Sequence, residues 1–520
     1  MPAVVLGASL LNAPAAHAAE EAESVLNGRC AACHQRLPDG GLSRISEARR
    51  TPEGWDMSIV RMMLVHGVEV TPEERRVLVK HLADSQGLAP AETSDFRYIL
   101  ERRPDAIESP PDEEFAAMCG RCHSFARVAL QRRDADEWTR LAHFHLGQYP
   151  TTEYQALGRD RNWWEIASKD LPPRLAELYP FATEAWSKWQ AGDHASAAGE
   201  WRVVGHRPGK GSFEGIMTVS ASGDDAYDLK LAIGYADGEQ VSGSGSAIVY
   251  TGFEWRARVT LGDQAWLHVA ALDENGNEMS GRAFLADADS LGAELHAART
   301  DGSARVLSVS PPFVRVGETV SVAIHGVGLD GAVSLGEGVD IVDTAASSST
   351  TVTVRVNASG SAGARTLTVG DASAAGLFTV YDKVEAVRVV PDYAIARVGG
   401  NNGPLPAVPA QFDAVAYLLG ADGQAGTDDD VRIGVMPAEW SVSNNGEAAE
   451  GMNDVAHAGQ MSAHGLFNPA GAGLNPGRRY STNNVGDLSV NATVTDGDNV
   501  VEGSGRLIVT VQRWNDPPIR

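Results

Sequence analysis

Two short segments of the chain repeat one pattern of two cysteines and a histidine. Residues 29–36 read RCAACHQR and residues 118–125 read MCGRCHSF, so each contains Cys-x-x-Cys-His. A Cys-x-x-Cys pair can hold zinc, exchange disulfides or tether a haem. Only the haem requires a histidine directly after the second cysteine, where it becomes an axial iron ligand. The pattern therefore predicts two covalently attached haem c groups.

The cysteine content of the chain supports this interpretation. All four cysteines of the sequence lie in the two motifs, so none is left for a structural disulfide. A four-cysteine zinc ribbon places its pairs ~15–20 residues apart, which is much closer than here, and thioredoxin-type exchange needs neither the histidine nor a second copy. The residues predicted to attach the haems are Cys30, Cys33, Cys119 and Cys122, with His34 and His123 as the first iron ligands.

An internal repeat downstream of each motif indicates the second axial ligands. The segment RRTPEGWDMSIVRM at residues 49–62 aligns without a gap with RRDADEWTRLAHFH at residues 132–145. In both segments the last residue follows the tryptophan by two helical turns and shares its face. A helix that presents a tryptophan and a ligand on one face can pack over a porphyrin. The predicted axial pairs are His34 with Met62, and His123 with His145.

Competing ligands lie on the same two segments. His66 is one turn beyond Met62 on the same face, whereas Met63 is adjacent but rotated, and Met57 lies off that face. His143 lies ~200° from the last residue of its segment in helical phase. Methionine is also a common core residue, so a packing role for Met62 stays open.

The mixed ligation has a consequence for electron flow. Methionine–histidine ligation raises the reduction potential of a haem relative to two histidines. The first haem is therefore expected to have the higher potential, and the chain to offer a downhill step. Neither iron would then have an open position for chemistry.

Each repeat begins with two arginines, for which the sequence leaves two interpretations. Guanidinium groups pair well with carboxylates such as haem propionates, but arginine pairs are also common at solvated helix starts. For Arg49 and Arg132 we favour the solvated position. We expect Trp55 and Trp138 to pack in the core and to contact the porphyrin edge.

Helix-start signals surround both motifs. Thr51 precedes a proline at the first helical position, residues 71–74 form a capping box with the same proline, and Asp134 caps the segment that follows it. Apolar residues recur at helical spacing between these starts. The sequence therefore predicts a helical dihaem cytochrome c domain over residues 19–190.

Beyond residue 190 glycine and serine increase, and alternation replaces the helical period. Residues 273–276, DENG, read as a hairpin turn. The unit at residues 304–384 resembles the IPT/TIG immunoglobulin-like family through its Gly317 turn and the GVGL stretch at residues 326–329. The predicted class is multidomain α + β, in which the helical domain is followed by a β-barrel-like domain (191–303), an immunoglobulin-like sandwich (304–384) and a C-terminal β-sandwich (385–520).

Charge and the N-terminal residues suggest a compartment. The net charge of −25 argues against nucleic acid and against an anionic membrane surface as partners. No stretch of ~18 apolar residues predicts a membrane span. Residues 1–18 end in Ala-His-Ala, a signal-peptidase pattern, although the basic start of a signal peptide is missing and the true start codon stays open. We expect a signal peptide remnant and a periplasmic protein, because haem is attached covalently on that side of the membrane.

The order of these segments resembles the alpha subunit of bacterial quinohaemoprotein amine dehydrogenases. RTPEGWDMSIVRM, GLAP, CGRCHSFARVALQRRDADEW and HLGQYP carry the resemblance, which covers essentially the whole chain and is most specific over residues 28–190. It implies a periplasmic heterotrimer with a propeller subunit and a small subunit that carries cysteine tryptophylquinone, where primary amines are oxidised. This chain would then pass electrons to a blue copper protein of the azurin kind or to a soluble cytochrome c, without catalytic residues of its own.

Two other functions stay open from the sequence. A dihaem peroxidase-like enzyme would need one iron with an open or displaceable ligand. A haem-based redox sensor would use the β domains as adhesion modules. The absence of a spare cysteine for a quinone crosslink agrees with the amine dehydrogenase interpretation, in which the quinone belongs to another subunit.

Overall fold

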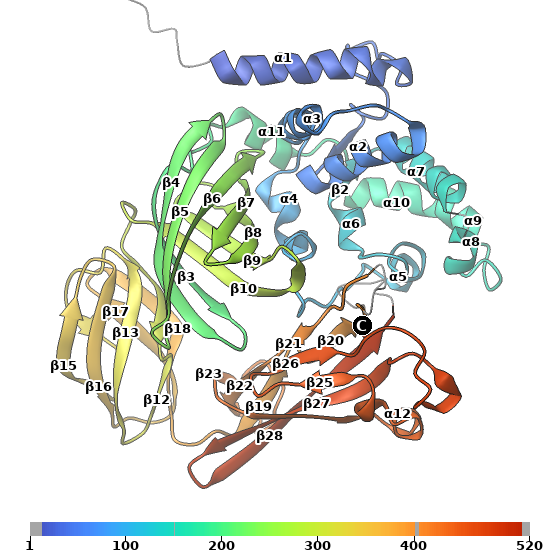
Figure 1. Ribbon diagram of the computed structural model, residues 1–520. Helices are drawn as coiled ribbons and strands as arrows, with labels where there is room; N and C mark the ends of the chain where they lie inside the picture. The colour runs from blue at the N-terminus through green and yellow to red at the C-terminus, as the bar shows by residue number, and fades with distance from the viewer. Residues whose placement is uncertain (1–12, 150, 401–404, 512–520) are drawn as a thin grey trace, which may run out of the picture.

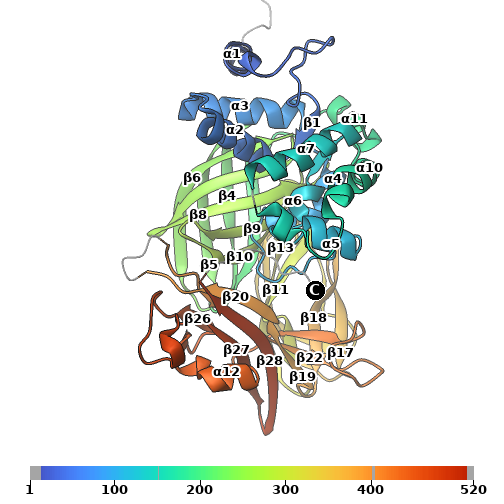
Figure 2. The same cartoon turned by 90° about the vertical axis from the view of Figure 1, so that its right-hand side faces the viewer.

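The computed structural model describes residues 13–149, 151–400 and 405–511. A helical domain is followed by an eight-stranded closed barrel and two further β domains (Figure 1). The expected multidomain α + β class is therefore confirmed. The helical domain covers one end of the barrel, where α2 and α3 lie (Figure 2).

The helices of the first domain begin where the sequence places their caps. Thr51 caps α2, Asp134 caps α7, and Thr71 forms the expected capping box with Glu74 at the start of α3. These side chains satisfy N–H groups that the first helical turn leaves free. The helices are α1 (Ala13–Gly28), α2 (Pro52–His66), α3 (Pro72–Ser85), α4 (Pro90–Thr93), α5 (Glu113–Cys119), α6 (Ala126–Ala129), α7 (Ala135–Gln148), α8 (Thr152–Gln155), α9 (Trp163–Glu165), α10 (Leu171–Leu178) and α11 (Glu184–Ala191).

The helical domain has two small cores, which define two lobes. The first lobe, α1 to α3, buries Trp55 against Leu78 and its neighbours. The second lobe, α5 to α10, buries Trp138 with Phe115 and Leu171. Both tryptophans are 3% exposed, so their expected packing role is confirmed.

A short antiparallel ribbon joins the two lobes. Strand β1 (Ala48–Arg50) pairs with β2 (Gln131–Arg133), and Arg49 lies opposite Arg132. These two arginines are also aligned positions of the internal repeat. The ribbon therefore relates the repeats as a local two-fold axis would.

The expected signal peptide lies partly outside the described residues, which begin at residue 13. Residues 13–18 form the first part of α1, and this helix continues to Gly28 without a break at the expected boundary. Ala22, Val25 and Leu26 of α1 are buried in the core of the first lobe. Cleavage after Ala18 stays a prediction. No helix in the described residues is long and apolar enough to cross a membrane.

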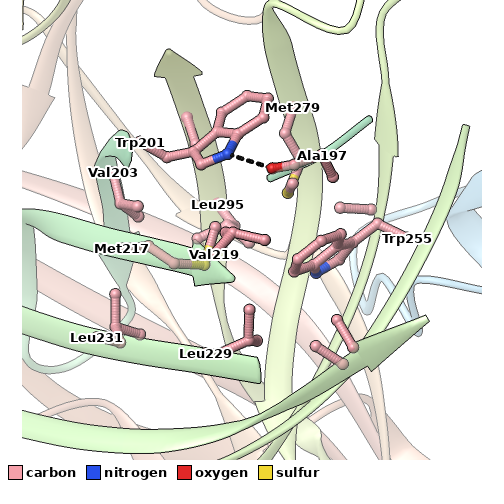
Figure 3. Close-up of a cluster of buried hydrophobic side chains, with 14 of the residues drawn as sticks. Ala197, Trp201, Val203, Met217, Val219, Leu229, Leu231, Trp255, Met279 and Leu295 are labelled. Atoms are coloured by element: carbon pink, nitrogen blue, oxygen red, sulfur yellow. Dashed lines mark hydrogen bonds between the residues drawn. The ribbon is translucent and has the colours of Figure 1, made fainter. Parts of the chain in front are cut away.

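The second domain is a closed barrel in which β10 pairs with β3. Alternate residues of its strands fill the interior, including Trp201, which donates to the Ala197 carbonyl at 3.0 Å (Figure 3). The expected hairpin turn at residues 273–276 connects β8 to β9. The strands are β3 (Gly199–Arg207), β4 (Gly211–Gly223), β5 (Ala226–Tyr235), β6 (Gln240–Tyr250), β7 (Glu254–Leu261), β8 (Gln264–Leu272), β9 (Glu278–Leu285) and β10 (Ala288–Arg299).

The third domain is the expected sandwich of two four-stranded sheets, ordered β11-β13-β16-β15 and β12-β18-β17-β14. Gly317 has a φ of +84° in the turn before β13, which explains the glycine at that position. The strands are β11 (Arg305–Ser310), β12 (Phe313–Arg315), β13 (Thr319–Val327), β14 (Val333–Ser334), β15 (Val339–Ser347), β16 (Thr351–Ala358), β17 (Gly363–Val369) and β18 (Ala372–Tyr381).

The fourth domain is also built from β-sheets, with a small helix between them. Its sheets are β19-β22-β23, β20-β28-β27-β24 and β21-β26-β25. Their elements are β19 (Ala386–Val390), β20 (Tyr393–Arg397), β21 (Ala410–Gln411), β22 (Asp413–Leu418), β23 (Val431–Val435), β24 (Glu439–Asn444), α12 (Glu447–Met452), β25 (Gly459–Met461), β26 (Leu466–Pro469), β27 (Gly486–Asp496) and β28 (Asn499–Thr510).

The barrel contacts every other domain. The N–H of Thr251 donates to Asp84 at the end of α3 at 2.8 Å. Arg202 hydrogen-bonds to the third domain, and His206 bonds to Asp413 of the fourth domain at 2.7 Å. The barrel thus fixes the orientation of the helical domain through directed polar contacts.

Candidate haem sites

The first Cys-x-x-Cys-His motif lies directly after α1. Cys30 begins the 3₁₀ turn η1 (Cys30–Ala32) and is half-buried, whereas Cys33 is exposed. The N–H of His34 donates to the Cys30 carbonyl at 2.9 Å and folds the motif into one compact turn. Two thiols and one imidazole therefore come from a single turn of the chain, as a thioether-linked haem requires.

The second motif begins at the last residue of α5. Cys119 ends that helix and Cys122 is exposed. Burial raises the pKa of Cys30, and it raises the pKa of Cys119 to about 12. Thiol exchange needs a thiolate at neutral pH, so the environment of these cysteines argues against a thioredoxin-type role.

The three candidate histidine ligands share one orienting contact. Nδ1 of His34, His123 and His145 donates to a main-chain carbonyl at 2.7, 2.9 and 2.8 Å respectively. A carbonyl only accepts, so the proton lies on Nδ1 and Nε2 keeps its lone pair. Histidines that bind metals are typically held in this way by their second nitrogen.

The structure brings the imidazole rings of His123 and His145 close together. Their ring centroids are 6.4 Å apart with an interplanar angle of 42°. Two metal–imidazole bonds of about 2 Å, with roughly 1 Å from each nitrogen to its ring centre, add up to about 6 Å. Burial lowers the pKa of both histidines, which favours the neutral form that binds iron. The residues present therefore fit a haem iron between these two rings.

The competing residue His143 has a different environment. It is exposed, and its ring contacts Trp164 edge-on with centroids 4.8 Å apart. The structure therefore brings His145, and not His143, next to His123. This agrees with the helical phase of the repeat, and ligation itself stays a prediction.

The second ligand of the first haem is less defined. Met62 is half-buried on α2, Met63 packs against the core of the first lobe, and His66 is exposed in the last turn. Met57 is exposed, and its sulfur accepts from the Arg127 guanidinium at 2.6 Å. Within the described ranges no hydrogen bond or ring contact connects these four α2 residues to the first motif's histidine, so its pairing with Met62 stays a prediction.

The expectation that Arg49 and Arg132 lie at solvated helix starts is wrong. They are 2% and 5% exposed because their backbone forms the ribbon between the lobes and directs both side chains inward. Arg49 binds both carboxylate oxygens of Glu92 at 2.8 and 2.9 Å, and Nε of Arg132 binds the same carboxylate at 3.1 Å. Their charges are therefore satisfied within the protein.

The second arginine of each pair has a different position. The guanidinium of Arg50 lies 5.1 Å from the ring centre of Trp55, and that of Arg133 lies 5.8 Å from that of Trp138. Nε of Arg50 and the indole N–H of Trp138 are buried without a hydrogen-bond partner in the described structure. Unpartnered donors of this kind fit the carboxylates of a porphyrin.

Sequence reasoning missed two buried glutamates that position these sites. Glu92 follows a proline by two residues and looks like an ordinary helix-start glutamate, so nothing distinguished it. Glu108, 2% exposed, accepts from the N–H groups of Phe125 and Ala126 at 2.7 and 3.0 Å and from the hydroxyl of Ser124. It thereby fixes the segment whose carbonyl orients the second motif's histidine.

The helical domain and its two motifs define a cytochrome-like haem-binding protein, to which three β domains are attached. Four family models match successive parts of the chain. The models are quinohemoprotein amine dehydrogenase A, alpha subunit, haem binding, and alpha subunit domains II, III and IV, with matches at residues 20–186, 194–300, 303–382 and 387–519 respectively. The chain belongs to the family of quinohemoprotein amine dehydrogenase alpha subunits.

Some solved structures resemble parts of the chain. A redesigned β-barrel is 18% identical, with a TM-score of 0.19, and the match covers 21% of this chain and all of that one. Mouse clustered PcdhgC3 EC1-3 is 12% identical, with a TM-score of 0.17, and the match covers 48% of this chain and 76% of that one. These likenesses carry no argument about function. A comparison with curated proteins found no match.

Proposed function

We propose that this chain is the electron-carrying subunit of a periplasmic quinohemoprotein amine dehydrogenase and that it binds two covalent haem c groups. A haem iron supplies one-electron chemistry by alternating between its ferric and ferrous states. Membership of the family supports the assignment to an amine-oxidising oxidoreductase. The two complete motifs support the number and the covalent attachment of the haems.

The proposed roles follow from the residues of the two sites. The cysteines would form thioethers to the porphyrin vinyl groups, and the histidines and the methionine would bind iron. The thioether residues are Cys30, Cys33, Cys119 and Cys122. The residues that would bind the two irons are His34 with Met62 and His123 with His145.

Two one-electron centres match the stoichiometry of amine oxidation. A primary amine and water give an aldehyde and ammonia, with release of two protons and two electrons. We assign this chemistry to a quinone on another subunit, expected to be cysteine tryptophylquinone, because every cysteine of this chain belongs to a haem motif. A blue copper protein or a soluble cytochrome c would then accept the electrons one at a time.

The proximity of the imidazoles of His123 and His145 is the observation that carries this proposal. Both rings are oriented by main-chain carbonyls and lie close together, which supports one imidazole for each side of the second iron. A peroxidase needs an iron with an open or displaceable position. At the second site this arrangement supports electron transfer over the peroxidase-like alternative.

The β domains are proposed to serve as the scaffold for the other subunits, which are a propeller subunit and a small quinone-bearing subunit in a heterotrimer. The family supports the existence of partners, because its members are subunits by description. Periplasmic location is proposed from the covalent attachment of haem and the signal-like residues before position 19.

Purification from the native host tests this function. We expect the chain to carry the mass of two haems, to co-purify with two further subunits, and to be reduced when a primary amine is added to the complex. The reduced complex should bind carbon monoxide slowly or weakly. A chain that purifies alone and stays oxidised with amines, or one that binds carbon monoxide rapidly at one haem, would overturn the proposal.

A further inference from the structure

Four arginines gather between the two candidate haem sites, and we call them the guanidinium cluster: Arg44, Arg50, Arg61 and Arg133. Arg50 and Arg133 come from the paired strands β1 and β2, and the charges of Arg133, Arg61 and Arg44 act on Arg50. One buried carboxylate, Glu137, pairs with Arg44 at 3.3 Å and with Arg133 at 3.1 Å. Within the described residues, no carboxylate pairs with Arg50 or Arg61. The cluster therefore carries more positive charge than the protein around it neutralises.

The guanidinium cluster spans both lobes. Arg61 precedes Met62 on α2 of the first lobe, and its guanidinium lies 4.6 Å from the ring centre of Phe144 on α7 of the second lobe. Phe144 in turn precedes His145. Helices α2 and α7 lie side by side in both views (Figures 1 and 2). Arg61 thus connects the two helices that carry the candidate second ligands of the two haems.

The cluster contains buried positive charge that the protein compensates only in part. Nε of Arg50 is buried without a hydrogen-bond partner in the described structure. Burial, followed by the charges of Arg133, Arg61 and Arg44, lowers the pKa of Arg50 well below its ordinary range. Buried cations that repel each other are costly unless a counter-charge and hydrogen bonds compensate them. Guanidinium groups select carboxylates, which they bind with two parallel hydrogen bonds.

The position of the cluster identifies the carboxylate. In a c-type haem the cysteines attach to the vinyl edge, and the two propionates leave from the opposite edge. At the second site Cys119 ends α5, and the carboxylates at the start of that helix pair with Arg174. Arg133 of the cluster pairs instead with Glu137 on α7. The cluster therefore lies on the α7 side of the second site, and not on the helix whose thiol would bind the vinyl edge.

We propose that the guanidinium cluster is a shared carboxylate site that binds propionates of both haems and couples their reduction potentials. This inference rests on the proposed function, because it needs both haems. A propionate that loses its guanidinium partner places an uncompensated negative charge near the iron. That charge favours the ferric state and lowers the potential, and a shared site transmits the effect to both haems.

Arg61→Gln is the test variant, because Arg61 is half-buried and makes no ion pair in the described structure. Resonance Raman spectroscopy of the haem-loaded chain monitors the propionate bending bands, and spectroelectrochemistry measures both potentials. We expect the propionate bands to shift and both potentials to fall. Arg61→Lys keeps the charge without the planar fork, so it should shift the bands but retain most of both potentials.

Arg76→Gln is the matched control. Arg76 lies on α3 of the same lobe, is 61% exposed and pairs with Glu73, so its loss removes one charge without touching the cluster. It should change neither the bands nor the potentials measurably.

The outcomes separate this inference from the proposed function. Two covalent haems with propionate bands that Arg61→Gln leaves unchanged would overturn the carboxylate site. A fall confined to one potential would overturn the sharing. A mass with fewer than two haems would instead contradict the proposed function, and with it the basis of this inference.

Discussion

Glu92 lies between Arg49 and Arg132 and binds both, so one carboxylate holds the equivalent arginines of the two repeats. Thr183 also donates to it at 2.9 Å and the N–H of Ala89 at 2.8 Å. Burial alone would raise the pKa of Glu92. The hydrogen bonds from Arg49 and Ala89 and the charge of Arg132 outweigh that effect and lower the pKa to about 2.

Glu92→Gln should therefore destabilise the helical domain. The substitution leaves two buried guanidinium groups without a counter-charge, for which we expect a loss of about 3 kcal/mol in the free energy of unfolding. Chemical denaturation followed at the haem absorption band measures it. Glu73→Gln, which breaks an exposed pair, should cost about 0.5 kcal/mol or less.

The pH dependence of the unfolding free energy of wild type and Glu92→Gln provides a sharper test. The pKa of Glu92 is depressed on folding, so its stabilisation is fully present above about pH 4.5, its ordinary value, and is lost as the pH falls towards 2. The difference in unfolding free energy between wild type and Glu92→Gln should therefore shrink over that window. A difference in unfolding free energy that stays constant between about pH 6 and about pH 3 would contradict this account.

His145→Ala should open the second haem. Loss of this imidazole leaves an iron with one protein ligand, so the reduced protein should bind carbon monoxide rapidly at one of its two haems. His143→Ala removes an exposed histidine two residues away on the same helix and should leave the absorption spectrum and carbon monoxide binding unchanged. If His143→Ala bound carbon monoxide rapidly and His145→Ala did not, the iron ligand would be His143.

Met62→Ala should remove the sulfur-to-iron charge-transfer band of the oxidised protein and lower the potential of one haem, because methionine ligation raises it. Met63→Ala should keep that band but reduce stability by about 2 kcal/mol, since Met63 packs against the first core. His66→Ala should change neither property. Persistence of the band in Met62→Ala would assign the ligand elsewhere.

Glu108→Ala should disturb the second haem, although Glu108 is not one of its predicted ligands. The substitution leaves the N–H groups of Phe125 and Ala126 without their acceptor, at a cost of about 2–4 kcal/mol. Because Ser124 supplies the carbonyl that orients His123, we also expect a changed spectrum of the second haem alone. Glu113→Ala, on the exposed start of α5, provides the control, and equal spectra for the two variants would exclude a positioning role.

Much of the fold followed from local signals in the sequence. Thr51, Thr71 and Asp134 marked helix starts correctly because capping depends only on neighbouring residues. The alternation after residue 190 predicted strands for the same reason. Closure of the barrel between β10 and β3 depends on residues far apart in the chain, and no local pattern encodes it.

The residues of the candidate site also divide into those that local sequence patterns predicted and those that depend on distant contacts. The motif cysteines and histidines were identified from spacing, and the helical phase singled out His145, which the structure places beside His123. The environment of Arg49 and Arg132 was misjudged, because their partner Glu92 lies about forty residues from each of them. Long-range ion pairs of this kind have no signature in a single sequence.

The ribbon of β1 and β2 has an architectural consequence. It is an isologous contact, the kind that two identical subunits make across a two-fold axis, but here both halves belong to one polypeptide. In a true homodimer, a side chain near the two-fold axis occurs twice, once in each subunit, unless both subunits share one group on the axis itself. A fused chain can place one asymmetric carboxylate there, and each half can then accumulate different substitutions without disturbing the joint.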